Sequence, residues 1–244
     1  VAERLTVARK EDGAKITVEW RGQQKHLNVI TMPAGILYFN PDTHRIRAQR
    51  TLDPERNTKL EEHPWSEDAQ QYLHKLLTCK PSDPNSIDPD FIALRDELDK
   101  FGQKDPGIIT PDGIMVDGNT RCAALRELHE PNIRVAVLPD DTSREDINAV
   151  ELALQLRRDK RRDYTYINRL IAIEDELASG RSQDDIARAF NIKVTTLQKD
   201  RWVFQLINDA LERSRSDDGR VGLRLPDFED HQEKLRELQR DYEK

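Results

Sequence analysis

An abrupt change of pattern after residue 138 is the feature that most constrains how this chain of 244 residues can fold. Before it, helical segments alternate with short β-rich segments bounded by turn residues, which are typical of strands. The expected strands lie at 5–7, 16–20, 27–30, 36–39, 108–110, 114–116 and 133–138. After residue 138 the apolar residues follow only helical spacing. The sequence therefore predicts an α+β half at about 1–140 and an all-helical half at about 141–244.

Helical periodicity and turn residues organise the remaining segments. Residues 91–101 place their apolar side chains on one helix face, and Gly102 ends that helix. Residues 108–116 predict a two-stranded hairpin around a central Pro-Asp-Gly turn. Three prolines between residues 80 and 90 predict a loop there. Further helices are expected at 66–77, 119–128, 142–158 and 164–179.

Composition excludes several classes of protein. No apolar run approaches the ~18–20 residues of a membrane span, and no charged-then-apolar leader opens the chain. Two cysteines, Cys79 and Cys122, are too few for a disulfide framework or a zinc site. We therefore expect a cytoplasmic protein without a membrane partner.

The net charge of −7 is unevenly distributed along the chain. Residues 157–208 carry a net charge of +3, whereas the segments on both sides of them are acidic. A nucleic-acid contact is therefore expected in this basic segment. Its first residues form a cluster of cations, from which we expect Arg161 and Arg162 to grip DNA phosphates.

Residues 182–204 have the spacing of a helix-turn-helix. Ser182 is expected to cap a short helix, and Asn191 lies where the chain must turn with a left-handed residue. The second helix carries cations and hydrogen-bonding side chains of the kinds that reach bases and phosphates. The expected DNA-binding residues are Lys193, Thr195, Thr196, Gln198, Lys199 and Arg201, with Asp200 as the single acid among them. The alternative is a plain helical hairpin in a bundle.

A second constellation lies where a predicted strand meets a helix, at residues 116–125. Gly118 ends the strand and the helix begins at once, so backbone N–H groups and the helix dipole favour an anion there. Asn119 and Thr120 add short donors, and Arg121 can fork onto a phosphate. The alternative is an ordinary turn in which Asp117 caps the helix and Arg121 forms a surface ion pair.

Residues 94–138 resemble the core of the ParB/sulfiredoxin superfamily. The matching pieces are 98–102, Pro106-Gly107-Ile108-Ile109, Gly113, and the Gly-x-x-Arg of 118–121 followed by Ala123-Ala124-Leu125. Upstream, Asn40-Pro41-Asp42-Thr43-His44-Arg45 is similar to the Asn-Pro-x-x-x-Arg element of that family. With the helix-turn-helix, the resemblance covers about residues 30–205. It implies a ParB/sulfiredoxin-like small mixed-sheet domain at 1–140, a helix-turn-helix DNA-binding domain at 141–210 and a C-terminal helical tail at 211–244.

The resemblance also implies a nucleotide pocket. Its phosphate-binding residues would be Arg45, Gly118, Asn119, Thr120 and Arg121, with His44 beside them. The implied ligand is a nucleoside triphosphate, CTP or ATP, accompanied by Mg²⁺. Partition proteins of this family bind and hydrolyse CTP while clamping DNA, which would place the chain on the nucleoid.

Three departures from the family pattern limit which activities of the family can be expected of this chain. A sulfiredoxin carries a reactive Cys at the turn, whereas this chain has Asn119-Thr120-Arg121, and Cys122 is expected to be a small buried residue. Partition proteins carry Gly-Glu-Arg-Arg here, so CTP specificity does not transfer directly. The polar segment 47–89 is longer than the family core usually has, and it is expected to be a lid or a decorated loop.

Other residues have plain and functional interpretations. Asp112 and Asp117 could hold Mg²⁺ beside a triphosphate, although turn and cap duty also explains them. Trp20 and Trp65 are expected in local cores. Leu235 and Leu238 repeat at roughly heptad spacing, which predicts either a helix that forms a homodimer or one that packs back on its own chain.

Three functions are consistent with these features. The first is a ParB-like DNA-binding protein with a nucleotide pocket. The second is an enzyme that uses the same pocket, an NTPase, nuclease or kinase, and is targeted to DNA. The third is a regulator whose ParB-like domain serves protein interaction. We rank them in this order, because a nuclease needs metal-holding acids and only Asp112 and Asp117 lie near Arg121 in the sequence.

Overall fold

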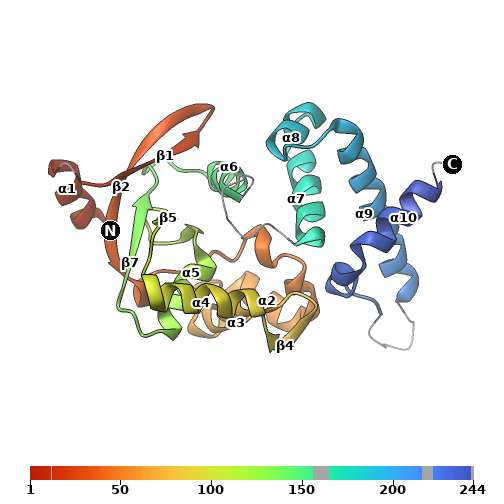
Figure 1. The fold of residues 1–244 in the computed structure, drawn as a ribbon, viewed down its shortest axis with the longest axis horizontal. Coiled ribbons are helices and arrows are strands. Elements are labelled where there is room, and N and C mark those ends of the chain that lie inside the picture. The colour runs from red at the N-terminus through yellow and green to blue at the C-terminus, as the bar shows by residue number, and fades with distance from the viewer. Residues whose placement is uncertain (12, 156–164, 216–221, 243–244) are drawn as a thin grey trace.

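The computed structural model describes residues 1–11, 13–155, 165–215 and 222–242, and it has the predicted α+β class (Figure 1). The first half is built on a five-stranded mixed sheet with the order β1-β2-β7-β5-β6. In that order the strands are Lys15–Trp20, Gln23–Pro33, Asn132–Val137, Gly107–Ile109 and Met115–Asp117. β5 and β7 run parallel, and the other neighbours are antiparallel. The strands expected at 16–20, 27–30, 108–110, 114–116 and 133–138 are therefore confirmed.

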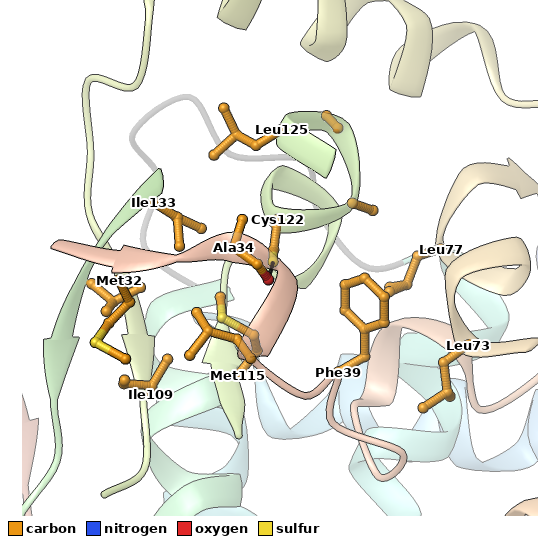
Figure 2. Packing of buried hydrophobic residues seen from close by; sticks show 14 of the residues in the cluster. Met32, Ala34, Phe39, Leu73, Leu77, Ile109, Met115, Cys122, Leu125 and Ile133 are labelled. Carbon is orange, nitrogen blue, oxygen red and sulfur yellow. Dashed lines mark hydrogen bonds between the residues drawn. The ribbon is translucent and has the colours of Figure 1, made fainter. Parts of the chain in front are cut away.

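Helices cover one face of the sheet with a continuous apolar core (Figure 2). Alternate residues of the strands, including Met32, Ile109 and Ile133, point to this face. Cys122 and Leu125 meet them from the helix above. The covering helices are α1 (Ala2–Lys10), α3 (Glu67–Thr78), α4 (Pro89–Phe101) and α5 (Asn119–Glu127). Cys122 is fully buried, which confirms the expectation of a small core residue, and burial raises the pKa of its thiol.

The opposite face of the sheet is covered by α6 (Arg144–Gln155). Val150 and Leu154 of this helix pack against Val18, Leu27 and Ala136 of the sheet. The helix predicted to begin the all-helical half is therefore also part of the core of the α+β half. The continuation predicted for it to residue 158 lies outside the described residues.

Three local predictions are wrong. Residues 5–7 belong to α1, in which Leu5 is buried against the sheet, whereas Val7 is 50% exposed. Residues 36–39 form no strand but a short 3-10 turn (Ala34–Ile36) and one bridge between Tyr38 and Ile114. The Arg126 guanidinium donates to the carbonyls of residues 34 and 37, so these groups need no strand partner. The loop expected at 80–90 contains a hairpin of β3 (Cys79–Lys80) and β4 (Asp83–Ile87).

The long polar segment is an ordered layer on the sheet domain. It follows the 3-10 helix η2 (His44–Ile46) and contains the 3-10 helix η3 (Gln49–Leu52), the helix α2 (Pro54–Glu62), and then α3. Ser66 caps α3 as predicted, by accepting a hydrogen bond from Ala69 N at 3.2 Å. Trp20 is buried as expected, but Trp65 is 45% exposed and only contacts Tyr38 edge to face.

The second half is helical throughout its described residues and lies to one side of the sheet domain (Figure 1). It contains α7 (Tyr166–Ala178), α8 (Gln183–Ala189), α9 (Val194–Ser214), the 3-10 segment η4 (Leu225–His231) and α10 (Gln232–Tyr242). The tail packs back on its own chain, with Leu235 buried and the Tyr242 ring 5.1 Å from that of Trp202. Leu238 is 54% exposed. None of the described helices is long and apolar enough to cross a membrane.

Asn168 of α7 joins the two halves. Its side chain is fully buried and accepts a hydrogen bond from Ala48 N at 2.9 Å. Its amide nitrogen lies 2.7 Å from the Arg45 carbonyl and 3.1 Å from Gln49 Oε1. The segment that contains η2 and η3 is therefore held directly by α7, a helix of the second half.

Candidate functional site

The first candidate site begins at the turn between β6 and α5. Gly118 has φ of 90° and is the N-cap of α5, a left-handed conformation that glycine adopts at low cost. A Cβ here would lie 3.3 Å from Gly107 Cα, so the close packing of the two glycines also requires a residue without a side chain. The first helical hydrogen bond runs from Cys122 N to Gly118 O, and the earlier N–H groups have no partner within the helix. The turn therefore presents a helix N-terminus, with Gly118 as its N-cap residue.

Asn119 and Arg121 are held differently from each other. Asn119 is 5% exposed, and its Oδ1 accepts from Asn40 N at 3.0 Å while its Nδ2 donates to Met115 O at 3.3 Å. Its amide thus ties the start of α5 to the segment that carries Arg45. Arg121 donates from Nη1 to the Asp105 carbonyl at 2.8 Å. That bond orients a guanidinium along the loop that follows α4.

A cavity of about 380 Å³ lies at this turn. The five residues that the sequence predicts for phosphate binding all line it: Arg45, Gly118, Asn119, Thr120 and Arg121. Arg45 comes from η2, more than 70 positions before the turn, so the fold brings the two sequence motifs together. Such a combination of guanidinium groups and a helix N-terminus favours an anionic ligand.

The cavity wall also contains charged residues that the sequence reasoning missed. Lys104 adds a cation, and acids come from α4, the loop after it and α6: Glu97, Asp105 and Glu151, besides Asp117. Glu151 was detectable in principle, because it is an acid among the apolar residues of α6. Asp117 is 4% exposed, whereas Asp112 is exposed in the hairpin turn. In the described part of the chain, no three His, Cys, Asp or Glu side chains gather to hold a metal ion.

His44 and Glu151 form a buried pair behind the cavity. They are 3% and 1% exposed, and His44 Nδ1 lies 3.5 Å from Glu151 Oε2. The other carboxylate oxygen of Glu151 accepts from Thr43 Oγ1 at 2.5 Å and from His44 N at 3.2 Å. Burial opposes the charged imidazolium, but the adjacent Glu151 carboxylate and the charge of Asp175 outweigh it, so the pKa of His44 is raised.

The second candidate site is the predicted helix-turn-helix of α8 and α9. Ser182 caps α8 by accepting from Asp185 N at 3.1 Å, and Asn191 has the predicted left-handed conformation with φ of 51°. Ile186, Phe190 and Leu197 form the core of the motif with residues of α7. α8 and α9 are thus joined by a short turn, and both pack against α7.

The expected DNA-contacting residues do not all have the same surroundings. Lys193, Thr195 and Gln198 are exposed, and Thr196 and Lys199 are half-buried. Arg201 is paired with Glu174 at 2.9 Å. Asp200 does not lie on the outer face as expected, because it is 4% exposed and pairs with Arg169 at 2.6 Å. Arg161 and Arg162 lie outside the described residues.

Three comparisons with known proteins were made. A scan against protein-family models and a search of curated protein sequences gave no match. Among solved structures, the chain is similar to the C-terminally truncated chromosome-partitioning protein ParB from Caulobacter crescentus complexed to the centromeric parS site. The identity is 13% over 76% of this chain and 79% of that chain, with a TM-score of 0.42.

Two further solved structures to which the chain is similar are also of ParB proteins. The Caulobacter crescentus protein complexed with CTP-γ-S is 12% identical over 87% of this chain and 92% of that chain, with a TM-score of 0.30. A Pnob8-like ParB-N domain is 10% identical over 78% of this chain and 76% of that chain, with a TM-score of 0.44. These scores describe a distant likeness in fold.

Proposed function

We propose that this protein is a ParB-like DNA-binding protein that takes a nucleoside triphosphate in the cavity at α5 and DNA on α8 and α9. The observation that carries the proposal is the convergence of Arg45, Arg121 and the α5 N-terminus on one cavity. Guanidinium groups and a helix N-terminus are the groups that bind phosphates. Within this proposal residues 1–140 bind nucleotide, residues 141–210 bind DNA on the nucleoid, and residues 211–244 brace α9.

The proposal includes Mg²⁺, which would bind together with the phosphates of the nucleotide. Mg²⁺ usually keeps several waters and binds through one or two carboxylates together with the phosphates of its substrate. The buried Asp117 in the cavity wall can supply one such carboxylate. CTP and ATP are the nucleotides to be tested first, together with GTP and UTP.

The nucleotide half of the proposal is tested by calorimetry with the four triphosphates and Mg²⁺. We expect one or more to bind, and Arg121→Ala to weaken binding about 10- to 100-fold, because a charge-assisted hydrogen bond contributes about 1.5–3 kcal/mol. Arg95→Ala is the matched control, since Arg95 lies on α4 outside the cavity and pairs with Asp96 and Glu127. Equal binding by both variants, or no binding by the wild type, would refute the pocket.

The DNA half is tested by fluorescence anisotropy with a labelled duplex over a range of salt concentrations. We expect Lys193→Ala with Lys199→Ala to weaken binding and to reduce the salt slope by about 2, if each lysine contacts one phosphate. Lys59→Ala with Lys75→Ala is the matched control on α2 and α3. Arg121→Ala should leave DNA binding without nucleotide unchanged. If the two control lysines matter as much as the α9 pair, DNA does not bind on α8 and α9.

One observation favours the enzymatic alternative. Glu97, Asp105 and Glu151 join Asp117 in the cavity wall, so more acids lie near Arg121 than its neighbours in sequence suggested. Acids beside bound phosphates can orient an attacking water or hold a metal ion. Release of inorganic phosphate and nicking of a plasmid, each measured with Mg²⁺ and with Asp117→Asn, would distinguish an NTPase or nuclease from a protein that only binds nucleotide.

A further inference from the structure

Both ring nitrogens of the buried His44 face a carboxylate. Nδ1 lies 3.5 Å from Glu151 Oε2 on α6, and Nε2 lies 3.6 Å from Asp175 Oδ2 on α7. Among the described residues, the other charged group that acts on the ring is Arg47, whose guanidinium is itself 3.1 Å from Asp175. The imidazole therefore bridges two helices that belong to different parts of the fold.

Two carboxylates beside the ring favour its protonated state. A neutral imidazole has one N–H and one lone pair, so one of the two carboxylates would face a lone pair. The imidazolium has an N–H on each nitrogen and can direct one at each carboxylate. The geometry thus matches a cation, independently of the raised pKa described above.

One member of the pair, Glu151, is also part of the wall of the candidate pocket. Glu151 lines the 380 Å³ cavity, and Arg45, which lines it too, follows His44 directly in the chain. A carboxylate in the wall of a phosphate pocket repels its ligand, and an adjacent imidazolium cancels that charge. Glu151 also accepts hydrogen bonds from Thr43 Oγ1 and His44 N, so the same group fixes the backbone that leads to Arg45.

We propose that His44, as an imidazolium, is a positioning residue of the nucleotide pocket, which neutralises Glu151 and holds Arg45 at the cavity. Loss of its proton then weakens the binding of a nucleoside triphosphate. This inference rests on the proposed function of the pocket, but the charge of His44 can be measured without any nucleotide.

The first experiment is a titration of the histidine side chains by ¹H–¹⁵N NMR of the full chain. We expect His44 to be doubly protonated at pH 7 and to titrate above the range of an ordinary histidine. In Glu151→Gln it should titrate at a lower pH, because one of its two anionic partners is removed. A neutral His44 at pH 7 in the wild type would overturn the inference, whatever the pocket binds.

The second experiment measures the affinity for the triphosphates by calorimetry between pH 6 and pH 9. Relative to His44→Gln at each pH, which cancels the titration of the nucleotide itself, wild-type affinity should fall about tenfold across the titration of His44. This is the size expected for one uncompensated charge at roughly 10 Å in a partly solvated pocket. His63→Gln, which alters an exposed histidine beyond α2, is the matched control and should keep the wild-type profile.

The two experiments separate the possible failures. If His44 is charged at pH 7 but wild type and His44→Gln show the same affinity profile, His44 does not act on the pocket and the inference is refuted. If Glu151→Gln binds nucleotide with a flat profile, compensation of the Glu151 charge is supported. If no triphosphate binds the wild type at any pH, the proposed function fails, and the role of His44 in the pocket fails with it.

Discussion

Replacing Asn168 with Ala should remove the joint between the two halves of the molecule. The fully buried Asn168 accepts from Ala48 N and donates to the Arg45 carbonyl. Alanine leaves these two buried backbone groups without their partner. Each orphaned group costs about 1–3 kcal/mol, so the free energy of unfolding should fall by about 2–6 kcal/mol. This is a large part of the roughly 5–15 kcal/mol that typical proteins have.

Urea denaturation followed by circular dichroism measures this loss. Gln71→Ala is the control, because Gln71 is exposed on α3 and its amide contacts only Glu67 among the bonds described. That substitution should change stability by no more than about 0.5 kcal/mol. Nucleotide affinity should fall in Asn168→Ala as well, since the Arg45 backbone loses its support. If the free energy of unfolding falls by less than about 1 kcal/mol in Asn168→Ala, the buried hydrogen bonds of Asn168 do not hold the two halves together as argued.

Three further predictions concern stability and the cavity. Burial raises the pKa of Glu229 from 4.5 to about 6, so its contribution is present below pH 4.5 and is lost as the pH rises through 6. Glu229→Gln should therefore gain up to about 2 kcal/mol relative to wild type between pH 4.5 and pH 8 in urea titrations, and parallel curves would contradict this. The Arg21 guanidinium lowers the pKa of Asp146 to about 2, so this contribution is lost only as the pH falls towards 2. Asp146→Asn should lower the melting temperature at pH 7 and leave it nearly unchanged at pH 2. Gly118→Ala should cost about 1–3 kcal/mol, because φ is +90° and Gly107 Cα is 3.3 Å from the new Cβ, and a wild-type melting curve would show that the turn relaxes.

Local signals accounted for most of the fold. The strand alternation, the Pro-Asp-Gly turn and the capping of Ser66 and Ser182 are short-range effects, and the structure has each of them. The errors arose where a tertiary contact overrides local preference. Residues 5–7 look β-rich, but they form part of α1, and this helix buries the Leu5 side chain against the sheet.

The pocket was predictable only in part, for a related reason. Gly118 to Arg121 form a local motif, and Arg45 came from the family resemblance. Glu151 and His44 are 107 positions apart, and no periodicity in the sequence pairs a buried acid with a buried histidine over such a distance. Asp200 was misjudged because its partner, Arg169, is on another helix.

The order of strands in the sheet has a consequence for the synthesis of this chain. β2 ends at residue 33 and pairs with β7, which begins at residue 132, and β5 also pairs with β7. On the ribosome both strands must therefore wait, with unpaired edges, until the last strand has emerged. Exposed edges of this kind favour aggregation. A nascent chain that stalls before residue 132 is thus the species for which a chaperone should matter most.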